Sequence, residues 1–145
     1  MPLFYALEQS LINILSEGVV QRFANLRHKA QLLRQGMLRL GLRFLIDQKN
    51  MCSVLTTVHL PSHIDMTAFR QKLRAQSIII YEGKGCFKNR VFQVGNIGEL
   101  SAVDIQFFLD ALGGVLREFK GTLPKPVFAI NSRKAIFDPV NAATI

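Results

Sequence analysis

Apolar residues recur every three or four positions along the first forty residues, which is the spacing of helices buried on one side. The first run consists of Leu3, Leu7, Leu11, Ile14 and Leu15. Gly18 interrupts the run, and a second one continues until Gly41, with polar residues that include Arg27 and Arg34 assigned to its other side. The pattern predicts helices over residues 3–15 and 19–40, and the second helix is amphipathic and expected to pack on a sheet.

Three short segments are rich in β-branched and aromatic residues, which are enriched in strands. They cover residues 52–60, 77–81 and 91–95, and residues 42–46 form a shorter candidate strand. A Gly-Lys-Gly turn at 83–85 favours a hairpin between the last two strands, so the sheet should be at least partly antiparallel.

Two further helices have readable starting signals. Asp65 is expected to be the N-cap of a helix that begins at Met66. Ser101 precedes another apolar helical run with Asp104 at its third position, a spacing close to a capping box. Two adjacent glycines inside this last helix should weaken it by about 1 kcal/mol each relative to Ala.

The order helix, short strand, strand, helix, strand, strand, helix predicts the fold class. It is an α/β (α+β) two-layer sandwich, with a small, mostly antiparallel sheet of three to four strands and helices packed on one face. Residues 1–120 are expected to form one domain. Residues 121–145 contain three prolines and no sustained period, so they are predicted to be a tail or arm, with a short strand at 127–130.

The net charge of +8 on 145 residues favours anionic partners but does not identify one. Basic residues are spread along the chain, so they form either a solvated basic surface or a face that binds a specific anion. No nucleic-acid motif or aromatic stacking platform accompanies the charge, so nucleic acid is an unlikely partner. Two cysteines, and no apolar run near the ~20 residues of a spanning helix, predict a cytoplasmic protein without a membrane partner.

The stretch "FQVGNIGEL" at residues 92–100 raises a choice between a phosphate loop, a plain turn and part of an active site. It lacks the third glycine of a dinucleotide fingerprint and the Gly-Lys-Ser/Thr of a P-loop. His59 and His63 are separated by Pro61, which excludes one helix face with both as metal ligands. The residues alone therefore indicate no self-contained active site and no metal site.

Several segments, taken in order, resemble a known family. They are "FYALEQSL", "EGVVQRF", a basic helix ending "LRLGL", "FRQKLRAQSIIIYEGKG" and "CFKNRVFQVGNIGELSAVDIQFFLDAL". Together they resemble the C-terminal small domain of class V, fold-type I aminotransferases, which use pyridoxal phosphate, and are closest to the 2-aminoethylphosphonate–pyruvate aminotransferases. The resemblance implies that the Schiff-base lysine belongs to a large domain with no counterpart in this chain. We therefore expect no cofactor in this chain and no catalysis by it alone.

The resemblance also implies candidate substrate-binding residues. In the family an arginine before the two glycines holds the substrate carboxylate, and the matching position here is Gln93. Gly95, Asn96 and Gly98 would bring the backbone close to the substrate. Arg90, three residues upstream, is a cation near enough to reach across, but no motif assigns it this task. The loss of the family's arginine means either that a different substrate group is bound or that the site has decayed or been repurposed.

The first helix gives the alternative functions. Without the large domain that it packs on in the family, its apolar side would be exposed and would find a partner. The expected partner is a second copy, in a homo-oligomer, or a missing aminotransferase large domain. An oligomeric interaction module or an amino-acid-sensing module is therefore the alternative to half of an enzyme.

Overall fold

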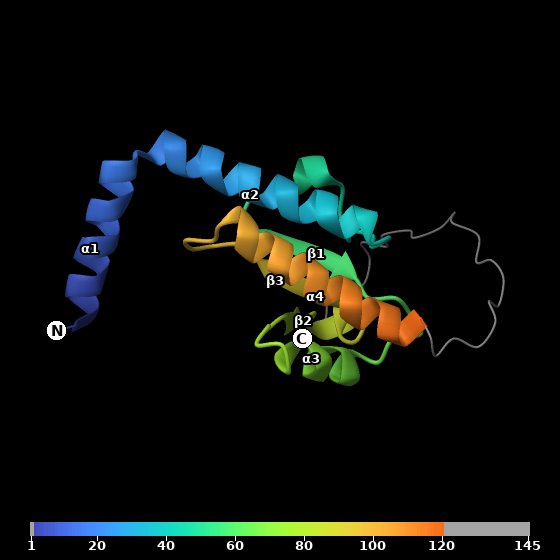
Figure 1. Cartoon of the computed structure of the whole chain (residues 1–145). Helices are drawn as coiled ribbons and strands as arrows, with labels where there is room; N and C mark the ends of the chain where they lie inside the picture. The colour runs from blue at the N-terminus through green and yellow to red at the C-terminus, as the bar shows by residue number, and fades with distance from the viewer. Residues whose placement is uncertain (1, 121–145) are drawn as a thin grey trace, which may run out of the picture.

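Two long helices begin the chain in the computed structural model, which describes residues 2–120. Helix α1 (Pro2–Glu17) and helix α2 (Val19–Arg39) are separated by Gly18, whose φ of 86° interrupts the helix. Helix α1 has no buried residue and projects away from the rest of the structure (Figure 1). The predicted tail at 121–145 and its strand at 127–130 lie outside the described residues.

The sheet has three antiparallel strands, as the sequence predicts. They are β1 (Leu55–His59), β2 (Tyr81–Glu82) and β3 (Val91–Gly95), in the spatial order β1-β3-β2. Of the short strand expected at 42–46, the structure retains one bridge, between Phe44 and Val58.

The strand predicted over residues 77–81 is wrong for most of its length, because β2 begins only at Tyr81. Ser77 adopts a left-handed backbone with φ of 61°, and the N–H of Ile78 donates to the carbonyl of Leu73 at 3.0 Å. These are features of a helix C-terminal motif in which a non-glycine residue takes the left-handed position. The segment thus ends the preceding helix and enters the sheet late.

The later helices begin at the predicted caps. Helix α3 (Met66–Arg74) is capped by Asp65, whose carboxylate accepts from the Ala68 N–H at 2.8 Å. Helix α4 (Ala102–Lys120) is preceded by Ser101, whose N–H and hydroxyl both donate to Asp104 at 2.7 Å. These bonds lower the pKa of Asp104, the side-chain hydroxyl being the larger cause. Short 3-10 turns span Gln48–Asn50 (η1) and Gly85–Phe87 (η2).

Helices α2, α3 and α4 cover one face of the sheet, and α2 and α4 lie side by side (Figure 1). Phe69 of α3 and Phe92 of β3 are fully buried, with ring centroids 5.2 Å apart. Burying such a ring contributes about 1.5–3 kcal/mol. Gly36 of α2 allows close contact with Leu109 of α4, since a Cβ at Gly36 would lie 2.9 Å from the Leu109 Cγ.

The sequence assignment of Arg34 to the exposed side of α2 is wrong. The exposed fraction of Arg34 is 6%, whereas the other arginines of α2, which are Arg22, Arg27 and Arg39, are partly or fully exposed. The spacing explains the burial, because Arg34 follows Ala30 by four positions and precedes Met37 by three, and both are buried. Across residues 2–120, no helix is both long and apolar enough to cross a membrane.

Candidate functional site

Gln93 lies at the centre of the sheet face opposite helices α2, α3 and α4, which we call the uncovered face although Val91 at one end of it is buried. Side chains alternate between faces along a strand, so Phe92 enters the core and Gln93 points to the opposite face. The register places Thr57 of β1 directly opposite Gln93 on one side and Tyr81 of β2 on the other. Residues paired in this way have Cβ atoms about 5 Å apart. We call Thr57, Gln93 and Tyr81 the polar row.

The polar row is uncharged. Thr57 and Tyr81 each provide a hydroxyl group, and Gln93 provides one amide NH2 and one carbonyl. Tyr81 is 68% exposed, and Thr57 and Gln93 are partly exposed, so all three are accessible. The row can form hydrogen bonds with a neutral polar group, but it lacks the cation that would pair with a carboxylate through two charge-assisted bonds.

The structure does not bring Arg90 into the polar row. Arg90 precedes β3, and three residues of extended chain separate it from Gln93 by about 10 Å. Its backbone carbonyl accepts from the Leu60 N–H at 2.9 Å, and its side chain is exposed. Whether its side chain reaches a ligand bound at Gln93 stays a prediction.

Asn96 fastens the loop after β3 to the segment before β1. Its Nδ2 donates to the Ser53 carbonyl at 2.9 Å, and its backbone N–H donates to the Val54 carbonyl at 3.1 Å. The residue is 1% exposed, and its Oδ1 has no hydrogen-bond partner among the described residues. The observed contacts of Asn96 thus hold the loop in place beside the polar row.

The two candidate glycines have different structural requirements. Gly98 has a φ of 110°, which side chains of L-residues rarely adopt. A Cβ at Gly95 would lie 3.8 Å from the Val54 carbonyl, an ordinary contact, so the backbone there requires no glycine. Only Gly98 therefore supports the expectation of a turn that needs glycine.

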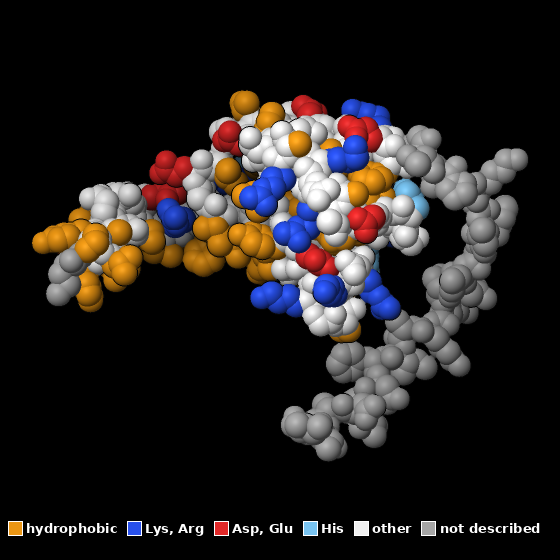
Figure 2. Space-filling view, turned by 90° about the horizontal axis from the view of Figure 1, so that it is seen from below, with side chains coloured by type: hydrophobic (Ala, Val, Ile, Leu, Met, Phe, Trp, Pro, Cys, Tyr) orange, Lys and Arg blue, Asp and Glu red, His pale blue; other side chains and the backbone are white. Residues whose placement is uncertain are grey.

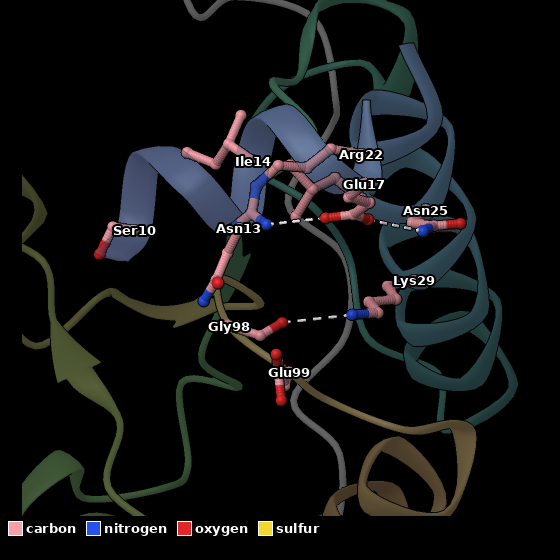
Figure 3. A pocket seen from close by; sticks show the side chains of 10 residues that line it. Ser10, Asn13, Ile14, Glu17, Arg22, Asn25, Lys29, Gly98 and Glu99 are labelled. Carbon is pink, nitrogen blue, oxygen red and sulfur yellow. Dashed lines mark hydrogen bonds and ion pairs between the residues drawn. The ribbon is translucent and has the colours of Figure 1, made fainter. Parts of the chain in front are cut away.

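A polar pocket of about 260 Å³ lies where α1 and α2 meet the loop that contains Gly98 (Figure 3). Lys29 of α2 donates to the Gly98 carbonyl at 3.2 Å. Glu17 accepts from Asn25 and from Arg22, each at 2.9 Å. The Asn25 bond first and the Arg22 bond second lower the pKa of Glu17. The bonds of Glu17 join α1 to α2, and the bond of Lys29 connects α2 to the loop after β3.

Comparison with known proteins identifies the class to which this fold and sheet belong. The ureidoglycine–glyoxylate aminotransferase of Bacillus subtilis superposes with a TM-score of 0.76 and 30% identity, over 80% of this chain and 30% of that one. The alanine–glyoxylate aminotransferase of Nostoc sp. superposes with a TM-score of 0.75 and 26% identity, over 79% and 31%. The fold is therefore that of one part of an aminotransferase.

Sequence comparison finds relatives among the transaminases. The 2-aminoethylphosphonate–pyruvate transaminase of Vibrio cholerae serotype O1 is 33% identical over 110 residues, which are 74% of this chain and 30% of that protein. The transaminase of Lactiplantibacillus plantarum with the same name is 32% identical over 111 residues. No protein-family model matches the chain. Over about three quarters of its length the chain is homologous to 2-aminoethylphosphonate–pyruvate transaminases and related class V aminotransferases, and it spans about 30% of the curated relatives it matches.

Pyridoxal phosphate, the cofactor of the full-length family, finds no lysine anchor among the strand residues of the sheet face that carries Gln93. Its covalent anchor is a lysine, and its pyridine nitrogen pairs with a further protein group, commonly a carboxylate. The strand positions on this face are Leu55, Thr57, His59, Tyr81, Val91, Gln93 and Gly95. They include neither a lysine nor a carboxylate, so these strands do not supply the covalent anchor.

Thr57 and Tyr81 were missed as candidate site residues. Each belongs to a segment that the sequence identifies as strand-like, but only the pairing register places them beside Gln93. Register depends on pairing between residues that are 12 positions apart for Tyr81 and Gln93 and 36 positions apart for Thr57 and Gln93, for which the sequence carries no local signal.

Proposed function

We propose that this chain is the substrate-side part of a pyridoxal phosphate-dependent aminotransferase, completed by a cofactor-binding region that it does not contain. The main support is the unequal coverage of the sequence match, which includes 74% of this chain but only 30% of the V. cholerae enzyme. The lack of a lysine among the strand residues of the uncovered face supports the same proposal. The chain alone is then not a catalyst.

The uncovered surfaces support a missing partner region. Helix α1 exposes Leu3, Phe4, Tyr5, Leu7, Leu11, Ile12 and Leu15, each by more than half of its surface. Figure 2 shows hydrophobic side chains gathered along this projecting arm. An apolar surface of this kind is characteristic of a helix that packs against another protein surface. In this proposal the cofactor-binding region covers α1, and the polar row faces the substrate.

Gln93 defines the substrate chemistry of the proposal. With a neutral amide in place of the arginine, the polar row favours a substrate group that is polar but uncharged. Each charge-assisted hydrogen bond is worth roughly 1.5–3 kcal/mol. Restoring the arginine should therefore raise kcat/KM for an amino-acid substrate about 10- to 100-fold in a complete enzyme.

A chimera tests the proposal. The part of the V. cholerae transaminase that matches this chain is replaced by this chain, with either Gln93 or Gln93→Arg. We expect both chimeras to fold and bind pyridoxal phosphate, and the arginine variant to transaminate faster. Gln106→Arg, on the exposed side of α4, is the matched control. Equal rates for all three proteins, with cofactor bound, would contradict the role given to Gln93.

A second candidate function is that of a self-associating interaction module, favoured by the same exposed face of α1. Leu7→Gln combined with Leu11→Gln removes two large apolar groups that are 55% and 51% exposed. If α1 pairs with a second copy, light scattering will show an oligomer for the wild type and a monomer for this variant. Val103→Gln, at a 76% exposed position of α4, should leave the oligomer intact. A wild-type monomer at micromolar concentration contradicts this function and leaves the aminotransferase proposal standing.

A further inference from the structure

A groove of about 420 Å³ lies between α2 and the segment that leads into β1, away from the polar row. We call it the basic groove. It is lined by Arg27, Ala30, Gln31, Arg34, Gln48, Lys49, Met51 and Ser53. Three of these eight residues are cations, and none is an aspartate or a glutamate.

Arg34 is the buried cation of the basic groove. Its Nε donates to the Thr56 hydroxyl at 3.1 Å, and its Nη2 donates to the carbonyls of Cys52 at 2.5 Å and Leu55 at 3.4 Å. All three acceptors are neutral, and Nη1 forms no hydrogen bond within the described residues. A buried charge without a counter-ion is unfavourable, and desolvation accordingly lowers the pKa of Arg34.

Among the cations of residues 2–120 only Arg34 is buried, whereas the four that form an ion pair with a carboxylate are all more exposed. Arg22 pairs with Glu17, Arg70 with Glu82 and Lys72 with Glu118. In the basic groove only Lys49 has such a partner, Asp47 at 3.7 Å, and both side chains are at least 75% exposed. Exposed pairs of this kind contribute little, so Lys49 remains available to a ligand. The groove therefore has an excess of positive charge around a guanidinium shielded from solvent.

We propose that the basic groove binds a compact oxyanion of the phosphate type. Arg34 already has its planar group fixed by three bonds, and its remaining nitrogen, Nη1, is a donor with a preset direction. Arg27 and Lys49 are exposed and can close on the anion from the helix and from η1. Gln31, Gln48 and Ser53 provide neutral donors for the other oxygens. A bound anion supplies the counter-charge that Arg34 lacks within residues 2–120.

The arrangement favours a small anion over a nucleic-acid strand. Nucleic-acid sites present a patch or stripe of basic residues along a surface, so that successive phosphates are contacted. Here the three cations line one groove, and the most buried of them donates to Thr56 of β1. The ligand is either free phosphate or the phosphate group of a small phosphomonoester.

Isothermal titration calorimetry of the full chain at constant ionic strength tests this site. The probes are inorganic phosphate, glycerol 3-phosphate, acetate and a single-stranded DNA. We expect saturable binding of at least one phosphate probe, at least tenfold weaker binding of acetate, and no tighter binding of DNA. Tighter glycerol 3-phosphate binding identifies a phosphomonoester, and tighter inorganic phosphate binding identifies the free ion.

Matched variants distinguish the groove from general charge. Arg27→Gln with Lys49→Gln removes two exposed cations from the groove and should weaken phosphate binding at least tenfold. Arg39→Gln with Arg74→Gln removes two exposed cations elsewhere and should change it less than twofold. Arg34→Lys keeps the charge and removes the planar donor group. If this variant folds, its phosphate binding should also be at least tenfold weaker than that of the wild type. Absent phosphate binding, equal losses in both double variants, or steeply salt-dependent DNA binding alone would overturn the proposal.

Discussion

Replacing Gly36 by alanine tests the close packing of α2 against α4. The new methyl group would clash with the Leu109 side chain, with 2.7 Å to its Cδ2 and 2.9 Å to its Cγ. Alanine gains about 1 kcal/mol over glycine in a helix interior. Overpacking a well-filled core costs about 1–3 kcal/mol. The net change should therefore lie between about zero and 2 kcal/mol of destabilisation.

Gly114→Ala is the matched control for this prediction. Gly114 also lies inside a long helix, and a Cβ there would meet nothing within 4 Å. The Gly114→Ala variant should have only the higher helix propensity of alanine and should therefore be about 1 kcal/mol more stable than the wild type. Because the helix term is common to both variants, their difference of about 1–3 kcal/mol isolates the clash with Leu109.

Urea unfolding at 25 °C, followed by circular dichroism, measures both free energies of unfolding. In a double-mutant cycle, Leu109→Ala should relieve much of the Gly36→Ala clash, so the combined cost should be smaller than the sum. If Gly36→Ala proves as stabilising as Gly114→Ala, or if the cycle is additive, then α2 and α4 do not pack as described.

Three further predictions concern the core and the helix caps. Phe69→Ala should cost about 3–5 kcal/mol because the ring is fully buried, whereas Phe107→Ala, at a 59% exposed position, should cost less than about 0.5 kcal/mol in the same unfolding experiment. Asp65→Ala should cost about 1 kcal/mol by removing the cap at Ala68, and Asp65→Asn should retain most of that stability. Hydrogen bonds from Ser101 lower the pKa of Asp104 in the fold, so its contribution is present above pH ~4 and is lost as pH falls through the lowered pKa. The difference in Tm between wild type and Asp104→Asn should therefore shrink on acidification, and a difference that stays constant from pH 7 to pH 2 would refute this.

Local signals explain which elements were predictable. The caps at Asp65 and Ser101 involve residues three positions apart, so their side chains and the helix starts can be read directly. The late start of β2 could not be read, because Ser77 takes a backbone conformation for which glycine or asparagine is the usual signal. A propensity for strand in 78–80 was overridden by the end of α3.

The candidate site was predictable only in part. The position of Gln93 follows from the resemblance of "FQVGNIGEL", but its neighbours Thr57 and Tyr81 follow from the sheet register alone. Arg34 was assigned to a solvated side because arginine is rarely buried. Its spacing from Ala30 and Met37 places it on the buried side of α2, but the residue type favoured the exposed side in the sequence analysis.

The central claim is that the cofactor is held outside this chain. A titration of the purified chain with pyridoxal phosphate, followed by borohydride reduction and peptide mass spectrometry, tests it most directly, beside the V. cholerae chimera. We predict that one lysine of the chimera, outside the residues contributed by this chain, is modified stoichiometrically. The chain alone should show only partial modification spread over several lysines. Stoichiometric modification of one lysine within these 145 residues, with the absorbance of an internal aldimine, would contradict the claim.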